Sequence, residues 1–244
     1  YVSLLTRFRS ALLSLFRRIN RFNKQSKEIN DVRSFIEMKP LLEKSGTKIP
    51  GSRPKIEFKS VFFKYPNAEE YVLKNCSFTI EAGQTVGLVG LNGSGKSTIV
   101  RLLCRFYDPT EGQILVDGID SREYDIVALR KCFGVLFQDF VHYSFSLREN
   151  VALSDSSAVN DDERIKKACR KGKVNEFTED WENGVDESLT RRFDPSGREL
   201  SGGQWQRISL ARTFFRDAPI VLLDEPSASL DPIAEHEIFS DFAE

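Results

Sequence analysis

Nine consecutive residues near the middle of the chain read Gly90-Leu91-Asn92-Gly93-Ser94-Gly95-Lys96-Ser97-Thr98. They fit the pattern G-x-x-x-x-G-K-[ST], in which glycines let successive backbone N–H groups turn toward a chain of phosphates. We expect Lys96 to supply a positive charge for the β- and γ-phosphates and Ser97 to offer its hydroxyl to Mg²⁺. The alternative is a glycine-rich turn that holds no ligand.

The flanks of this run agree with a phosphate site. Val86–Val89 is apolar on both faces and predicts a buried strand of a parallel sheet, and a helical pattern follows from Ser97 to Cys104. This order places the positive end of the helix dipole at the phosphates. Other buried runs lie at residues 114–116, 133–137 and 220–223, and helical patterns at 125–131, 161–169 and 203–215. The order predicts an α/β core with a helical insertion at about residues 140–205.

Two carboxylates end the last apolar run. Ile220–Leu223 is followed directly by Asp224 and Glu225. A buried strand that delivers an acid at its carboxyl end is where a nucleotide triphosphatase holds Mg²⁺, so we assign Asp224 to the metal. The chain turns at the strand end, which lets Glu225 orient or deprotonate a water molecule. Apolar strands often end in an acid, and the interpretation therefore depends on the glycine loop.

A second phosphate cradle is predicted at Leu200-Ser201-Gly202-Gly203-Gln204. This pentapeptide opens a helical pattern, and its backbone amides and serine hydroxyl form another helix start suited to phosphate. One chain with two such cradles suggests that a nucleotide lies between two copies of the chain.

The composition excludes several classes of protein. Of 244 residues, 40% are hydrophobic and 29% charged, which excludes wholesale disorder and collagen-like repeats. The 35 Lys and Arg nearly balance the 36 Asp and Glu, so we expect no nucleic-acid partner. The sequence has no apolar run of about 18 residues, and its four dispersed cysteines are predicted to be reduced, structural thiols.

The even charge balance hides two different parts. Residues 1–50 hold 11 Lys and Arg against 4 Asp and Glu, a net charge of +7, and the remainder carries −8. The first part predicts a helix of about 35 residues, on the order of 50 Å long. Its apolar stripe is Leu5, Phe8, Leu12, Leu15, Ile19 and Phe22. The stripe packs either on the body of this chain or on a partner, and a Pro- and Gly-rich linker follows at residues 40–54.

Residues 55–244 resemble the nucleotide-binding domain of an ATP-binding cassette (ABC) transporter, because the glycine loop, the pentapeptide and the acid pair occur in that family's order. The resemblance implies an α/β P-loop ATPase core with an antiparallel β subdomain and a helical subdomain, and ATP and Mg²⁺ as cofactors. It assigns Tyr65 to stacking on adenine, although an edge-strand tyrosine is the alternative. It assigns Gln138 to Mg²⁺ and the attacking water, and Asp231 to contact with the opposite subunit.

The resemblance thus implies three overlapping sets of site residues. The catalytic set is Glu225, Gln138 and Lys96, and the metal set is Ser97, Gln138 and Asp224. The nucleotide set is Tyr65, Gly90, Asn92, Gly93, Ser94, Gly95, Lys96, Ser97, Thr98, Gln138, Ser201, Gly202, Gly203, Gln204, Asp224 and Asp231.

The first fifty residues also resemble part of this family, namely exporters whose membrane and ATPase domains share one chain. Residues 1–39 would then be the cytosolic end of the last transmembrane helix, with the ATPase domain on the cytoplasmic side of a cell membrane. The implied partners are the transmembrane domain of the same full-length chain and a second nucleotide-binding domain. A homodimer with two equivalent sites is the simplest assembly, and a heterodimer with a degenerate partner is the alternative. The exported substrate is set by membrane helices that this sequence lacks.

The sequence departs from the family's pattern in two places. The family has a histidine beyond the acid pair that contacts the γ-phosphate, and His236 is a poor match, so we expect a chain truncated at both ends. The stretch Arg192–Arg198 also differs from the usual sequence before the pentapeptide. The alternatives are an ATP-binding, dimerising module without turnover, and a soluble ABC-type ATPase of DNA repair or translation.

Overall fold

The computed structural model describes residues 2–37, 42, 46–91 and 93–224. The chain divides into two compact units, Tyr1–Glu43 and Lys44–Glu244. The predicted site residues Asn92, Glu225 and Asp231 lie outside the described part, as does His236.

The first unit contains one long helix, as predicted. Helix α1 runs from Val2 to Ile36, which corresponds to about 50 Å at 1.5 Å per residue. Apolar side chains along it are exposed, among them Phe8, Leu15 and Phe22. None of the helices in the described part is both long and apolar enough to cross a bilayer.

The second unit begins inside the predicted linker. Residues 46–54 belong to this unit, and Lys48 is held on residues 123–125. The Lys48 N–H donates to the carbonyl of Glu123 over 3.2 Å, and its carbonyl accepts from the N–H of Asp125 over 2.9 Å. The predicted linker is therefore hydrogen-bonded to the second unit at Lys48.

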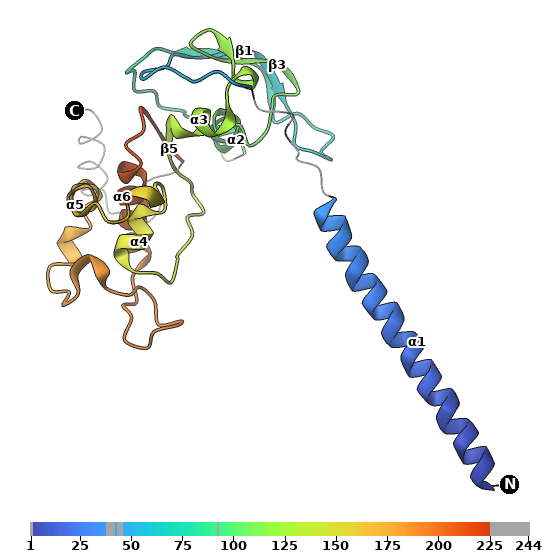
Figure 1. Ribbon diagram of the computed structural model, residues 1–244. Coiled ribbons are helices and arrows are strands. Elements are labelled where there is room, and N and C mark those ends of the chain that lie inside the picture. Colours follow the sequence, from blue (N-terminus) through green and yellow to red (C-terminus); the bar gives the residue numbers. More distant parts are fainter. Residues whose placement is uncertain (1, 38–41, 43–45, 92, 225–244) are drawn as a thin grey trace. The chain divides into compact units, whose positions relative to one another are not determined.

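A four-stranded antiparallel sheet forms one layer of the second unit (Figure 1). Its order is β2–β1–β3–β4, with bounds Leu73–Ile80 for β2, Ile56–Phe63 for β1, Glu111–Val116 for β3 and Ile119–Asp120 for β4. Strand β1 buries Ile56 and Phe58, then Val61 and Phe63. The register with both neighbours shifts between these two pairs, and such a bulge changes which residues face the core.

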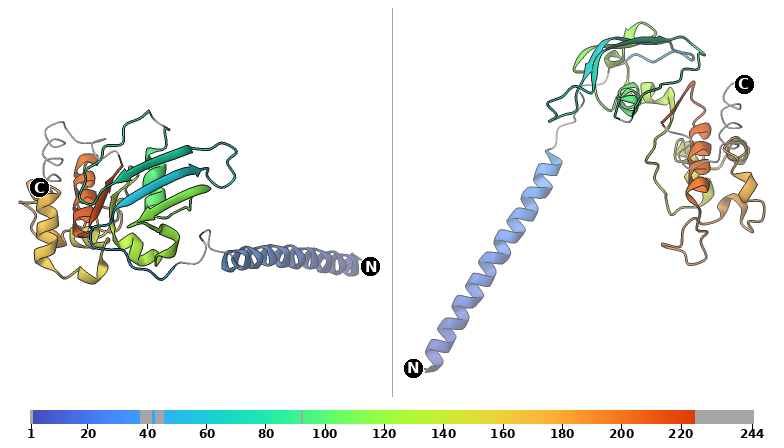
Figure 2. Two further views of the ribbon diagram at one scale, coloured as in Figure 1. Left: turned by 90° about the horizontal axis from the view of Figure 1, so that it is seen from above. Right: turned by 180° about the vertical axis from the view of Figure 1, so that it is seen from behind.

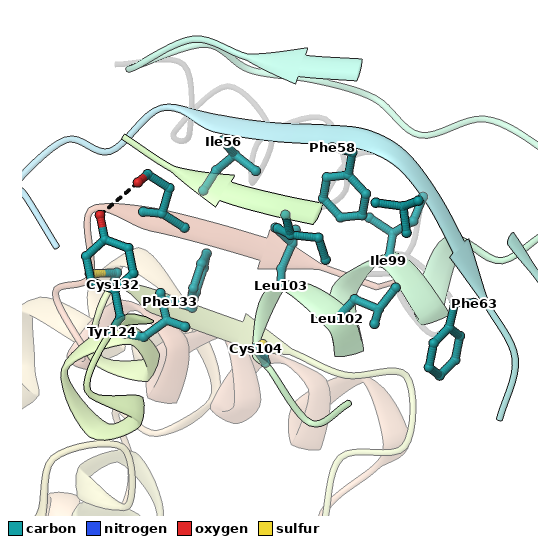
Figure 3. Packing of buried hydrophobic residues seen from close by; sticks show 14 of the residues in the cluster. Ile56, Phe58, Phe63, Ile99, Leu102, Leu103, Cys104, Tyr124, Cys132 and Phe133 are labelled. Carbon is teal, nitrogen blue, oxygen red and sulfur yellow. Dashed lines mark hydrogen bonds between the residues drawn. The ribbon is translucent and has the colours of Figure 1, made fainter. Parts of the chain in front are cut away.

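The main core lies between this sheet and two helices, α2 (Lys96–Leu103) and α3 (Ile126–Lys131). Figure 3 shows side chains of β1 and α2 packed together, and each large apolar side chain buried in this way contributes about 2 kcal/mol. Tyr124 is also buried there, and its hydroxyl donates to the carbonyl of Val116 over 2.7 Å. Helix α2, which follows the glycine loop, is thus fixed on the sheet.

Two parallel strands connect this core to the helical group. Strands β5 (Phe133–Leu136) and β6 (Ile220–Leu223) pair in register, with Leu136 opposite Leu223. The helical group contains α4 (Leu147–Ala152), α5 (Asp162–Lys171) and α6 (Gly202–Phe215), which pack together (Figure 2). Short 3₁₀ turns lie at Ser121–Glu123, Ser156–Ala158, Asn175–Phe177 and Gly184–Asp186. The predicted helices are confirmed, and strands form at three of the four predicted buried runs. The run at β6 is a strand but is not buried, because its residues are partly exposed and Val221 is 37% exposed.

The prediction of a buried strand at Val86–Val89 is wrong for the described structure. These residues form no strand, and Val89 is 99% exposed. A strand requires a neighbour that accepts and donates its backbone hydrogen bonds. Within residues 46–91 and 93–224, no strand pairs with this segment. The apolar pattern of Val86–Val89 therefore predicts a strand, but the described residues contain no neighbouring strand that pairs with it.

All four cysteines are free thiols, and Cys104, Cys132 and Cys169 are buried. Burial raises the pKa of Cys104 to about 12 and that of Cys169 to about 11. Both groups are therefore protonated and unreactive at neutral pH.

Candidate functional site

The glycine loop folds back on itself at the start of α2. Gly95 has a positive φ of 98°, and a Cβ added there would lie 2.7 Å from a methyl group of Leu73. The positive φ therefore favours glycine at this position, and a larger residue would also have to displace the Leu73 methyl group. The ammonium group of Lys96 donates to the carbonyls of Gly90 and Leu91, at 2.9 and 3.1 Å. The lysine charge is thus held inside the loop.

Asp224 lies directly after β6 and beside the loop. Its backbone N–H donates to the carbonyl of Leu136 over 2.9 Å, which extends the β5–β6 ladder by one residue. Its carboxylate Oδ1 accepts from the hydroxyl of Ser97 over 3.0 Å, and the residue is only 7% exposed. Two of the predicted site residues, which are 127 positions apart, are therefore brought together.

Gln138 lies at the same edge of the parallel pair. It follows the end of β5 by two residues, and Asp224 follows the end of β6 by one, while Leu136 and Leu223 are in register. The side chain is exposed. The carboxyl ends of parallel strands are where α/β proteins bind ligands. Among the described residues no cluster of three His, Cys, Asp or Glu is present.

Tyr65 lies two residues beyond β1 and contacts α2. Its hydroxyl is 3.0 Å from the hydroxyl of Thr98, and the guanidinium of Arg101 donates to it over 2.8 Å. The ring packs edge-on against Phe63 and Tyr107, with centroid distances of 5.1 and 5.3 Å. The predicted aromatic residue is thus anchored beside the helix that starts at the glycine loop.

Arg101 is a site-lining residue that the sequence did not reveal. It lies three positions after Thr98, so the two side chains share one face of α2. The hydrogen bond to Tyr65 raises the pKa of the Arg101 guanidinium, which stays charged. The helical spacing gives the shared face, but only the tertiary structure shows that Tyr65 reaches it.

The second predicted cradle is the first turn of α6. Ser201 caps the helix, because its hydroxyl accepts from the N–H of Gln204 over 3.3 Å. The side chain of Gln204 in turn accepts from the N–H of Ser201 over 2.9 Å. Gly202 and Gly203 occupy the first positions of the helix, where backbone N–H groups have no acceptor within the helix. This turn is exposed at Ser201 and Gly202.

The two cradles are separate within one copy. No hydrogen bond or ion pair described for residues 46–91 and 93–224 joins Ser201–Gln204 to Lys96, Ser97 or Asp224. The structure therefore assembles Tyr65, Ser97, Thr98 and Asp224 into one group, places Gln138 at its edge and leaves the α6 turn outside it.

Comparison with known proteins gives a consistent set of similarities. A family model described as ABC transporter matches residues 73–228. The nisin transport ATP-binding protein of Lactococcus lactis subsp. lactis is 44% identical over 180 residues, which cover 74% of this chain and 30% of that protein. The ATP-dependent lipid A-core flippase of Escherichia coli (strain K12) is 40% identical over 183 residues, which cover 75% of this chain and 31% of the flippase.

A solved structure gives the same likeness. A bacterial Atm1-family ABC exporter with ATP bound superposes with a TM-score of 0.75 at 32% sequence identity. The match covers 86% of this chain and 36% of the exporter chain. The chain therefore spans about a third of the length of these proteins.

Proposed function

Because this chain belongs to the ABC transporter family, we propose that it is the ATPase part of an exporter, which binds ATP with Mg²⁺ and hydrolyses it to drive a substrate across a membrane. The observation that carries the proposal is the contact between Ser97 and Asp224 at the end of the glycine loop. It joins the residue types that a nucleotide triphosphatase uses for its metal, in a fold that places them beside a phosphate cradle.

The donor set fits Mg²⁺. This ion prefers oxygen ligands, uses one or two carboxylates and takes further oxygens from phosphates and water. The Ser97 hydroxyl and the Asp224 carboxylate are 3.0 Å apart, and Gln138 adds an amide oxygen at the same edge. We propose that these three residues hold the ion. When bound, Mg²⁺ neutralises the charge that develops on the phosphate oxygens.

The nucleotide is held by groups on the loop and on the neighbouring sheet. We propose that Lys96 leaves the carbonyls of Gly90 and Leu91 and donates to the β- and γ-phosphates, since a phosphate is a stronger acceptor than a carbonyl. The ring of Tyr65, anchored at its hydroxyl by Thr98 and Arg101, stacks on adenine. Glu225 accepts a proton from the attacking water.

The second cradle belongs to the site of another copy. We propose that Ser201, Gly202 and Gly203 of one copy close over the γ-phosphate bound by a second copy, with Asp231 contacting the opposite subunit. The separation of the two cradles within one copy supports this arrangement. Because each chain carries both cradles, the assembly is a homodimer with two equivalent sites. Its closing and reopening move the membrane part between two states.

The helix α1 belongs to the membrane part of the exporter in this account. Its apolar side chains are exposed along much of its length, which supports packing against other helices. We propose that residues 1–39 continue the last transmembrane helix on the cytoplasmic side of the membrane. This chain matches a nisin transport protein and a lipid A-core flippase at similar identity, 44% and 40%, although their names give different substrates. We therefore propose that the membrane part selects the substrate.

Steady-state phosphate release from ATP tests this function, and its Mg²⁺ dependence tests the metal site. For Asp224→Asn, the Mg²⁺ concentration at half-maximal rate is expected to rise about 10- to 100-fold, because a neutral amide is a weaker ligand for a hard cation. Asp217→Asn is the matched control, since Asp217 is exposed at positive φ, a conformation that asparagine tolerates.

The outcomes separate the alternatives. Binding of ATP without phosphate release, in the full-length protein, would leave an ATP-binding module in place of an ATPase. Equal Mg²⁺ midpoints for Asp224→Asn and the unchanged protein would remove Asp224 from the metal site.

A further inference from the structure

We propose that His142 and Trp205 form a positioning pair that fastens the segment after Gln138 to the first turns of α6, and so couples the two nucleotide sites of the dimer. The coupling of the two nucleotide sites rests on the proposed function, whereas the attachment of residues 138–142 to α6 rests on the observed contacts alone. Neither residue belongs to the motifs that predict the nucleotide site.

The two rings are stacked. Their centroids are 4.4 Å apart and their planes differ by 8°. Trp205 is 3% exposed and belongs to the core of the helical group, whereas His142 lies on the surface. The imidazole therefore covers a face of the indole that would otherwise meet solvent. Phe140 extends the contact, with its ring 5.5 Å from that of His142.

The imidazole acts as a flat, uncharged ring in this contact. Partial desolvation of the imidazole and the nearby positive charge of Arg212 lower the pKa of His142. The ring is therefore neutral at pH 7 and stacks as an aromatic surface. Phenylalanine at this position supplies a ring of similar size that cannot accept or donate a proton.

The next residues of the segment, 143–146, are attached to the same face of α6 by Arg212 and Asn150. Arg212 lies seven positions, or about two turns, after Trp205, so both side chains leave the helix on one face. Its guanidinium lies over the ring of Tyr143 and donates to the carbonyl of Asn150 over 2.9 Å. The Asn150 carboxamide donates to the carbonyls of Tyr143, Phe145 and Ser146. Residues 143–146 are therefore fixed without His142, and the stack extends this attachment toward Gln138.

The His142–Trp205 stack lies next to the first turn of α6, which contains Ser201–Gln204. Trp205 is the fourth residue of α6, and its N–H donates to the carbonyl of Ser201 over 3.0 Å. A displacement of residues 138–142 is therefore passed through His142 to the turn that presents Ser201. In the proposed dimer Gln138 senses the nucleotide of its own copy and Ser201 that of the other copy. The pair thus connects the two proposed sites through a direct contact between rings.

Hydrogen–deuterium exchange of the full-length protein tests the fastening without any need for ATP turnover. In His142→Ala, amides of residues 138–142 are expected to exchange about fivefold faster, because a stacked aromatic contact is lost. His142→Phe is expected to keep the original exchange. Val141→Ala is the matched control, since Val141 is the neighbouring residue and 53% exposed. Unchanged exchange in His142→Ala, or equal acceleration in Val141→Ala, would overturn the proposal.

Phosphate-release kinetics then test the coupling. His142→Ala is expected to lower kcat about fivefold with KM for ATP changed less than about twofold, and to bring the Hill coefficient for ATP closer to one. His142→Phe is expected to restore both quantities. If His142→Phe is as impaired as His142→Ala, proton chemistry of the imidazole replaces stacking as the explanation. If the protein without any substitution releases no phosphate, the proposed function is refuted. The hydrogen–deuterium exchange result still tests whether His142 attaches residues 138–142 to α6.

Discussion

Lys96→Ala is expected to weaken ATP binding and to lower ATP turnover at least about a hundredfold, because the loop loses the positive charge that faces the β- and γ-phosphates. The structure adds a second reason. The Lys96 ammonium donates to the carbonyls of Gly90 and Leu91, so it also holds the loop in shape before nucleotide arrives. Both effects reduce binding as well as the chemical step, and kcat and KM should change together.

Equilibrium binding of ATP and steady-state phosphate release measure these two losses. Lys167→Ala is the control, because Lys167 is exposed on α5 and alanine preserves the helix. Normal ATP affinity in Lys96→Ala, with turnover intact, would show that the glycine loop is a turn without a ligand.

Glu225→Gln is expected to behave differently, with kcat lowered about a thousandfold while ATP still binds. Glutamine keeps the size and polarity of the side chain but cannot accept a proton from water. The neighbouring Asp224 remains to contact Ser97, so the proposed metal site is retained. The loss therefore falls on the chemical step alone.

Single-turnover hydrolysis and the amount of ATP bound at equilibrium distinguish this result from a binding defect. Glu163→Gln serves as the matched control, since the Glu163 side chain is 84% exposed on α5. A variant at Glu225 that turns over at the normal rate would require another general base.

Much of the fold follows from patterns that are local in the sequence. The 3.6-residue period predicts α1, α2, α5 and α6 close to their observed bounds, and the apolar runs predict β3, β5 and β6. The prediction at Val86–Val89 was wrong because an apolar run does not show whether a neighbouring strand is present.

Some residues of the candidate site and its surroundings could be predicted from local sequence, and others could not. Lys96, Ser97 and Asp224 were identified from short motifs, since each motif carries its own strand and helix context. Arg101, His142 and Trp205 were assigned no partner, because their contacts join residues 36 to 63 positions apart. Such contacts depend on how α2 packs on the sheet and how α6 packs on the segment after β5.

Mixing two inactive variants tests the central claim, that each ATP site is built from two copies. In a dimer of Lys96→Ala with Ser201→Ala, one site contains both defects, and the other combines the intact loop of one copy with the intact α6 turn of the other. An equal mixture of the two proteins should therefore regain activity, up to about a quarter of the original rate of phosphate release, since about half of the dimers are mixed and each has one intact site. A mixture no more active than the two variants measured separately would contradict a shared site.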